Sequence, residues 1–82
     1  MSIDYKTLLQ ETLQGGKLQA PVYTVVKTDG PPHQRTFHVE AEWAGGKVSG
    51  TGTSIKSAEM MAASEALKQL DGEKAALAKT KN

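Results

Sequence analysis

A short glycine-punctuated run leads directly into an alanine-rich segment between residues 50 and 70. The run Gly50-Thr51-Gly52-Thr53 has little side-chain bulk, and the segment after it places apolar residues at helical spacing. These residues are Ala58, Ala62, Ala63, Ala66, Leu67 and Leu70. Because alanine lets a helix backbone lie close to its neighbour, the pattern predicts a strand followed by a helix over residues 55–70 that packs closely on a sheet.

The start of this helix indicates an anion site. Ser54 is a favoured N-cap residue. The unpaired N–H groups and the positive end of the helix dipole attract anions there. Lys56 is locally unfavourable at this end of a helix unless an anion binds beside it. Two interpretations stay open for Lys56, a phosphate contact or an ordinary solvated lysine.

The rest of the chain predicts one more helix and two more strands. Residues 3–14 place Tyr5, Leu8, Leu9 and Leu13 at helical spacing, with Asp4 in the first turn. Residues 22–27 and 36–43 have the composition and alternation of strands, and residues 47–53 pair back as a third strand. The order predicts an α+β fold in which two helices cover one face of a three-stranded antiparallel sheet.

Length and composition limit the function classes. A chain of 82 residues forms one small domain, here assigned to residues 3–70, and residues 71–82 are expected to be a flexible tail. There is no cysteine, and the two histidines are too few to suggest a metal cluster. The acidic residues are scattered singly, so we expect no catalytic residues, no metal and no cofactor. We also expect a cytoplasmic protein, since no apolar run is long enough to span a membrane.

The motifs, taken in order, resemble a double-stranded RNA-binding domain, and most closely the one at the C-terminal end of bacterial ribonuclease III. The resemblance covers nearly everything from Asp4 to Leu70. It is carried by Asp4-Tyr5-Lys6-Thr7-Leu8-Leu9-Gln10-Glu11, Pro21-Val22-Tyr23, Gly30-Pro31-Pro32-His33, Phe37-His38-Val39, Gly50-Thr51-Gly52-Thr53-Ser54, Ala58-Glu59, Ala62-Ala63 and Ala66-Leu67.

The resemblance implies three regions that contact duplex RNA by its shape. The polar stripe of the first helix reads 2′-hydroxyls in a minor groove, the loop after the first strand enters the next minor groove, and the last helix meets phosphates. The residues assigned to them are Thr7, Gln10, Glu11 and Gln14 on the helix; Gly30, Pro31, Pro32, His33 and Arg35 in and beside the loop; and Ser54 and Lys56. Taken alone, the stripe also fits a solvated helix face and the loop a plain turn.

The chain departs from the family at the last helix. Ile55 stands where a lysine is common, and Glu59 where many members have lysine, although ribonuclease III forms often have glutamate there. Ile55 is free to pack against the sheet edge instead. Lys6 and Lys17 are candidates for supplementary phosphate contacts. Because these departures leave fewer phosphate contacts at the start of the last helix, we expect weak, salt-sensitive binding, in line with the net charge of +1.

The sequence therefore predicts a bacterial protein that binds double-stranded RNA without catalysis. The alternative is a degenerate module of the same fold that mediates protein contacts or dimerisation. Expected partners are double-stranded RNA and either a protein partner or a parent nuclease domain, with no membrane and no small-molecule cofactor. The start at Met1 and the lysine-containing tail favour a free-standing protein over an excised domain.

Overall fold

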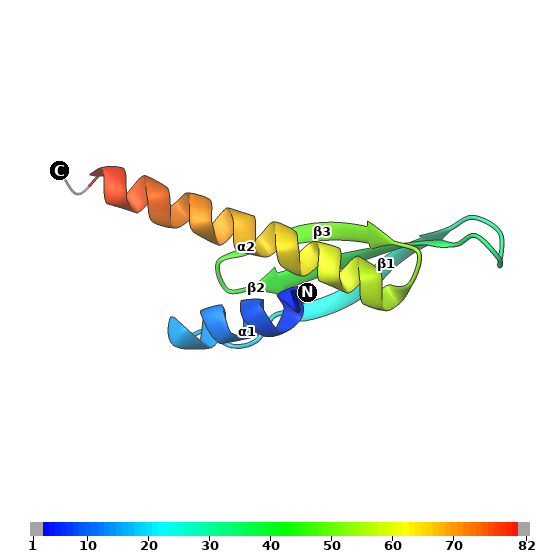
Figure 1. Ribbon diagram of the computed structural model, residues 1–82, viewed down its shortest axis with the longest axis horizontal. Coiled ribbons are helices and arrows are strands. Elements are labelled where there is room, and N and C mark those ends of the chain that lie inside the picture. The colour runs from blue at the N-terminus through cyan, green and yellow to red at the C-terminus, as the bar shows by residue number, and fades with distance from the viewer. Residues whose placement is uncertain (1–2, 81–82) are drawn as a thin grey trace.

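Two helices lie side by side over one face of a three-stranded antiparallel sheet (Figure 1). The computed structural model describes residues 3–80, with side chains described up to residue 73. The elements follow in the order α1 (Tyr5–Gly15), β1 (Val22–Asp29), β2 (Thr36–Trp43), β3 (Gly46–Gly52) and α2 (Ile55–Thr80). The strands are arranged β1-β2-β3, which confirms the predicted fold class.

Helix α1 begins one residue after Asp4, because Asp4 is its N-cap. The Asp4 carboxylate accepts a hydrogen bond from the Thr7 backbone N–H at 3.1 Å. The prediction that the helix starts at residue 3 with Asp4 in its first turn was therefore wrong by two residues. That hydrogen bond, to the ionised form, holds the pKa of Asp4 below its usual 3.8.

Strand β2 supplies the buried face of the sheet. Val39 and Ala41 are fully buried and Trp43 is nearly so, whereas Glu42 between them is exposed. In the register, Val39 lies opposite Val25 on β1 and Gly50 on β3. The predicted alternation along this strand is confirmed, and it directs the apolar side chains toward the helices.

Helix α2 builds the core with alanine. Ala58, Ala62, Ala63 and Ala66 are fully buried, as the sequence predicted. Ala58 and Ala62 pack with Val39 and Ala41. Ala63 and Ala66 pack in a second cluster of buried residues with three larger side chains, Leu9, Leu13 and Trp43.

Gly50 allows this close packing. A Cβ atom placed there would collide with the backbone nitrogen of Ala62 and lie 2.7 Å from the carbonyl oxygen of Ala58. At Gly50 the backbone of α2 therefore rests directly on the backbone of β3.

The end of α2 differs from the prediction. The sequence pattern predicted that the helix ends at Leu70, but it continues to Thr80. The added residues are mostly glutamate, lysine, alanine and leucine, which are strong helix formers. The single Gly72 costs only about 1 kcal/mol relative to alanine, which is too little to end a helix. The flexibility of residues 71–82 stays a prediction, and residues 81 and 82 lie outside the described part of the chain.

Candidate nucleic-acid interface

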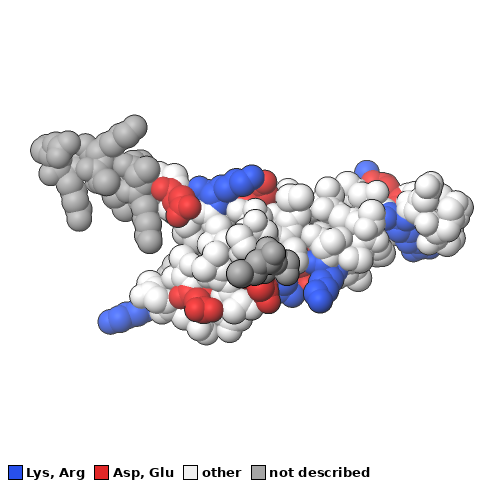
Figure 2. Space-filling view, in the orientation of Figure 1, with Lys and Arg blue, Asp and Glu red and all other residues white. Residues whose placement is uncertain are grey.

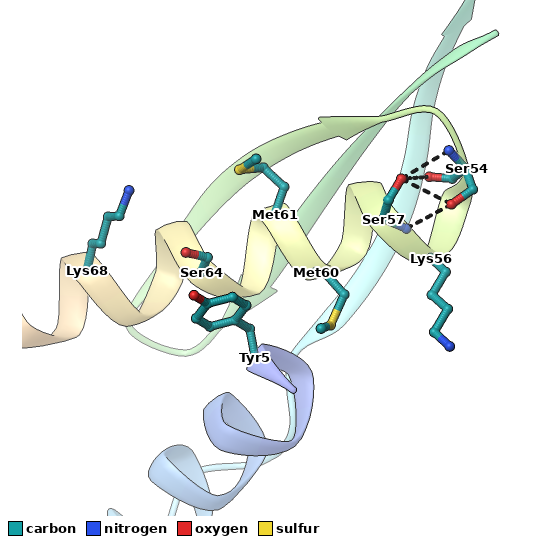
Figure 3. Close-up of a pocket in the computed structure, with 8 residues that line it drawn as sticks. All are labelled: Tyr5, Ser54, Lys56, Ser57, Met60, Met61, Ser64 and Lys68. Atoms are coloured by element: carbon teal, nitrogen blue, oxygen red, sulfur yellow. Dashed lines mark hydrogen bonds between the residues drawn. The ribbon is translucent and has the colours of Figure 1, made fainter. Parts of the chain in front are cut away.

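The first turn of α2 is closed by a reciprocal pair of serines (Figure 3). The Ser57 backbone N–H donates to Ser54 Oγ at 3.0 Å, and the Ser54 backbone N–H donates to Ser57 Oγ at the same distance. The predicted Ser54 cap is therefore confirmed, and Ser57 completes it in the manner of a capping box. The amides of Ile55 and Lys56 have no partner within the helix, as helix geometry dictates, and are available to an anion.

Lys56 is exposed beside this cap. Its side chain projects away from the helix rather than folding back over the cap (Figure 3). Its positive charge contributes, through Coulombic attraction, to the lowered pKa of Asp4. Ile55 is 45 % exposed, so it does not take up the packed position at the sheet edge that its apolar character allowed. The helix starts beyond Gly52, where β3 ends, and this leaves its first residue outside the core.

A largely apolar pocket lies along α2 beside Tyr5 of α1, and Lys56 forms part of its lining (Figure 3). Its lining includes Tyr5 from α1 and Met60, Met61 and Ser64 from α2. Ser54, Lys56 and Ser57 line the pocket at the start of α2, whereas Tyr5, Met60 and Met61 offer a phosphate few polar contacts to replace its hydration. An anion is therefore expected at the Lys56 end of the pocket, beside the free amides, and not against its apolar part.

The polar stripe of α1 faces solvent. Its four residues, Thr7, Gln10, Glu11 and Gln14, are all exposed. Leu9 and Leu13, on the opposite side of the helix, are buried against α2 and Trp43. The core contacts of α1 thus fix which of its sides is turned outward, and the whole stripe is presented together.

The loop between β1 and β2 projects beyond the sheet at one end of the molecule (Figure 1). Its residues Gly30, Pro31, Pro32, His33 and Arg35 are exposed. Gly30 has φ +87°, a left-handed conformation that glycine adopts without strain. The Gln34 N–H donates to the Pro31 carbonyl at 2.9 Å and closes a turn within the loop.

These three regions follow one another along the longest dimension of a molecule that measures 53 × 25 × 22 Å. In Figure 1, the β1–β2 loop forms one end of the molecule and the C-terminal part of α2 forms the other, while α1 and then the start of α2 lie between them. Among the described side chains, no hydrogen bond joins a predicted contact residue of one region to that of another. The regions are held in place by the sheet and the core, and not by direct contacts.

Charges of both signs are interspersed on the visible face, and no single basic patch dominates it (Figure 2). This distribution agrees with the net charge of +1. It indicates that electrostatic attraction to a polyanion is modest and depends on a few cations.

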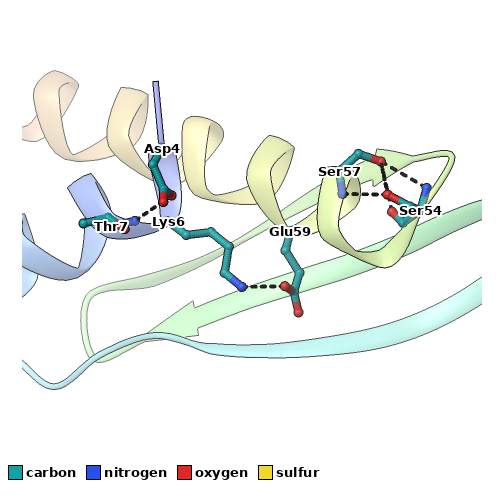
Figure 4. Close-up of polar contacts among 6 residues, drawn as sticks. All are labelled: Asp4, Lys6, Thr7, Ser54, Ser57 and Glu59. Carbon is teal, nitrogen blue, oxygen red and sulfur yellow. Dashed lines mark hydrogen bonds and ion pairs between the residues drawn. The ribbon is translucent and has the colours of Figure 1, made fainter. Parts of the chain in front are cut away.

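Sequence reasoning missed one ion pair that joins the two helices (Figure 4). Lys6 Nζ lies 2.6 Å from Glu59 Oε1 and 5.0 Å from the centre of the Tyr23 ring. Both partners are partly shielded from solvent. The two residues are 53 positions apart, so no local pattern could pair them.

Two further polar residues, Lys17 and His38, lie outside the three contact regions. Lys17 is exposed after the end of α1 and has φ 63°. His38, which received no predicted role, pairs with Asp29 at 2.8 Å between β2 and β1. No group of three or more possible metal ligands occurs among the side chains that the structure describes. Within residues 3–80, neither helix has the length and apolar character needed to cross a bilayer.

Known proteins resemble this chain in both sequence and fold. Residues 5–70 match the family described as the double-stranded RNA binding motif. Ribonuclease 3 of Syntrophotalea carbinolica is 49% identical over 70 residues, which is 84% of this chain and 30% of that protein. Ribonuclease 3 of Vibrio parahaemolyticus is 51% identical over 69 residues, or 82% of this chain and 31% of that protein. The chain thus spans less than a third of the length of these curated relatives.

A solved structure of Arabidopsis HYL1 superposes with a TM-score of 0.72 at 36% identity and covers 82% of this chain and 96% of that one. A structure of both double-stranded RNA-binding domains of DRB4 gives a TM-score of 0.68 at 38% identity, over 85% of this chain and 46% of that one. Fold, element order and sequence agree in these comparisons. The chain belongs to the double-stranded RNA binding motif family.

Proposed function

We propose that this domain binds duplex RNA by shape through the three regions described above, without catalysing a reaction. The observation that carries the proposal is the capped start of α2, with Ser54, exposed Lys56 and free amides, in a chain of this family. A helix start with free N–H groups and a nearby cation is suited to phosphate. In this proposal it contacts phosphates across the major groove.

The other two regions read features that distinguish RNA from DNA. On α1, Gln10 offers both a donor and an acceptor, while Glu11 accepts from a 2′-hydroxyl. A carboxylate is repelled by phosphate, so Glu11 favours hydroxyl recognition over general polyanion binding. His33 and the carbonyls of the stiff proline loop approach a second minor groove. Proline reduces the ordering cost of that contact.

We further infer that the domain is the RNA-binding module of a ribonuclease III-like protein, with the catalytic carboxylates on a separate domain. The support is the identity of about half to proteins of which this chain matches less than a third. A free-standing protein is the other possibility, and the cytoplasmic location inferred from sequence stays a prediction. The alternative of a degenerate protein-contact module is not favoured, since the family match extends through all three regions.

The test is a titration of the domain with a 20-base-pair RNA duplex over a series of salt concentrations. Lys56→Ala should weaken binding about eightfold at 0.1 M salt and reduce the salt slope by about 0.9, the loss expected for one phosphate contact. Lys47→Ala is the matched control, because Lys47 lies on β3 with its amine 3.8 Å from Glu40 of the neighbouring strand. The affinity of the Lys47→Ala variant for duplex RNA should equal that of the wild type.

Duplex DNA and single-stranded RNA of equal length complete the test. The wild type should prefer duplex RNA, because only RNA presents 2′-hydroxyls in an A-form minor groove. Equal binding of RNA and DNA duplexes, or an unchanged affinity in Lys56→Ala, would contradict the proposal and return the protein-contact alternative to first place.

A further inference from the structure

We propose that Glu59 limits the phosphate affinity of this interface, because its ion pair with Lys6 keeps that lysine from contacting a phosphate of the RNA. This inference rests on the proposed RNA-binding function. It assigns a role to two residues outside the three contact regions.

The ion pair lies between two of those regions. Lys6 is one helical turn before Gln10 on α1, so the two side chains share a side of that helix. Glu59 is three residues after Lys56 on α2, which makes them neighbours on the helix surface. Figure 4 shows the pair between the start of α1 and the Ser54 cap. A duplex that contacts both α1 and the start of α2 passes over this junction.

Lys6 is fixed at its amine by two contacts but remains accessible to a phosphate. Its amine is 2.6 Å from the Glu59 carboxylate and 5.0 Å from the Tyr23 ring centre, so both an ion pair and a cation–π contact fix it. Its side chain remains 37% exposed, compared with 21% for Glu59. The cation is thus close enough to solvent to meet a phosphate, whereas the carboxylate is the more enclosed partner.

The charges at the junction cancel. Asp4 and Glu59 oppose Lys6 and Lys56, two acids against two bases. A phosphate that approaches Lys6 must compete with Glu59 for it and is also repelled by Glu59. Removal of the carboxylate charge should therefore add one phosphate contact to the interface. Such an added contact makes the salt dependence steeper, which a purely structural effect on the helices would not do.

The experiment compares Glu59→Gln with the wild type in the RNA titration over salt. The variant should bind about eightfold more tightly at 0.1 M salt, with a salt slope steeper by about 0.9. The matched control is Glu65→Gln, which removes the same charge from α2 and breaks a 3.3 Å ion pair with Lys68. Glu65 borders a hollow on the β3 side of the helix, beside His38 and Thr51, so the slope should stay that of the wild type.

A second variant tests whether the gain passes through Lys6. In Lys6→Met, methionine keeps a long apolar side chain but has no charge, and adding Glu59→Gln should not steepen the slope. A steeper slope in this double variant, or an unchanged or shallower slope in Glu59→Gln alone, would overturn the inference. These outcomes leave the proposed function intact, because that function fails only if the wild type itself does not prefer duplex RNA or does not depend on Lys56.

Discussion

Single glycine residues determine how closely helix α2 can pack on the sheet. At Gly50 the backbone of α2 occupies the space that a Cβ would need. At Gly72, further along the same helix, nothing lies within 4 Å of such an atom. The same substitution should therefore have opposite effects at these two glycines, since one is enclosed by backbone and the other is open to solvent.

Gly50→Ala should lower the free energy of unfolding by about 3 kcal/mol, the upper part of the usual range for overpacking, because helix backbone cannot rotate out of the way. Gly72→Ala should raise it by about 0.5 to 1 kcal/mol by improving helix propensity. Urea unfolding followed by circular dichroism measures both. Wild-type stability in Gly50→Ala would mean that α2 can shift off the sheet without cost.

Helix α2 combines two functions at the scale of an element. Its buried alanines form part of both core clusters, while its first turn faces solvent with Lys56 and the Ser54 cap. Ser54 therefore influences both folding and the proposed phosphate contact. Substitutions that affect these two properties differently can separate them.

Ser54→Ala removes the cap acceptor and should cost about 1 kcal/mol of stability. Ser54→Asp keeps an acceptor and adds a negative charge, which is favourable at a helix start, so its stability should match that of the wild type. The same charge should weaken RNA binding several-fold through repulsion of phosphate. Thermal melting and the RNA titration give the two readouts. Full RNA affinity in Ser54→Asp would place the phosphates away from this turn.

The elements themselves could be predicted because their patterns are local. Alternation along β2 and the alanine spacing of α2 reveal which face is buried, and both were confirmed. The end of α2 could not be predicted in this way. Residues past Leu70 lose the apolar stripe that marks packing against the sheet, yet their helix propensity alone continues the helix to Thr80.

The candidate site was predictable only in part, for a related reason. Exposed helix faces, caps and loops depend on residues that are close together in the sequence, so a local pattern can predict them. All eleven predicted contact residues lie on the exposed surface. The pairing of Lys6 with Glu59 depends on how α1 and α2 pack together. Only the tertiary fold shows that one candidate phosphate ligand is already occupied.

At the scale of the whole molecule, the three regions are separated along its long axis, and in the proposed binding mode a short duplex contacts only some of them. Affinity for RNA should rise with duplex length and level off near about 16 base pairs. A variant with residues 30–35 replaced by Asn-Gly tests the loop. Asp29 and Thr36 are directly paired in the sheet, so a two-residue turn can join them.

This shortened variant should keep wild-type stability and bind an 8-base-pair duplex as the wild type does. It should bind a 20-base-pair duplex several-fold more weakly, since only the longer duplex extends to the loop. Fluorescence anisotropy with both duplexes distinguishes the cases. An equal loss on both lengths would indicate that the loop supports the fold, and no loss on either would remove it from the interface.

The participation of α2 in both core clusters also bears on how the domain comes apart. If that helix detached, Val39 on one side and Trp43 on the other would be uncovered in the same event. Partial opening that spares one half of the interior is therefore disfavoured, and unfolding should be all-or-none. A protease would then encounter either the folded domain with its RNA-binding surface intact or the unfolded chain. A partly unfolded form that still binds RNA would not be populated.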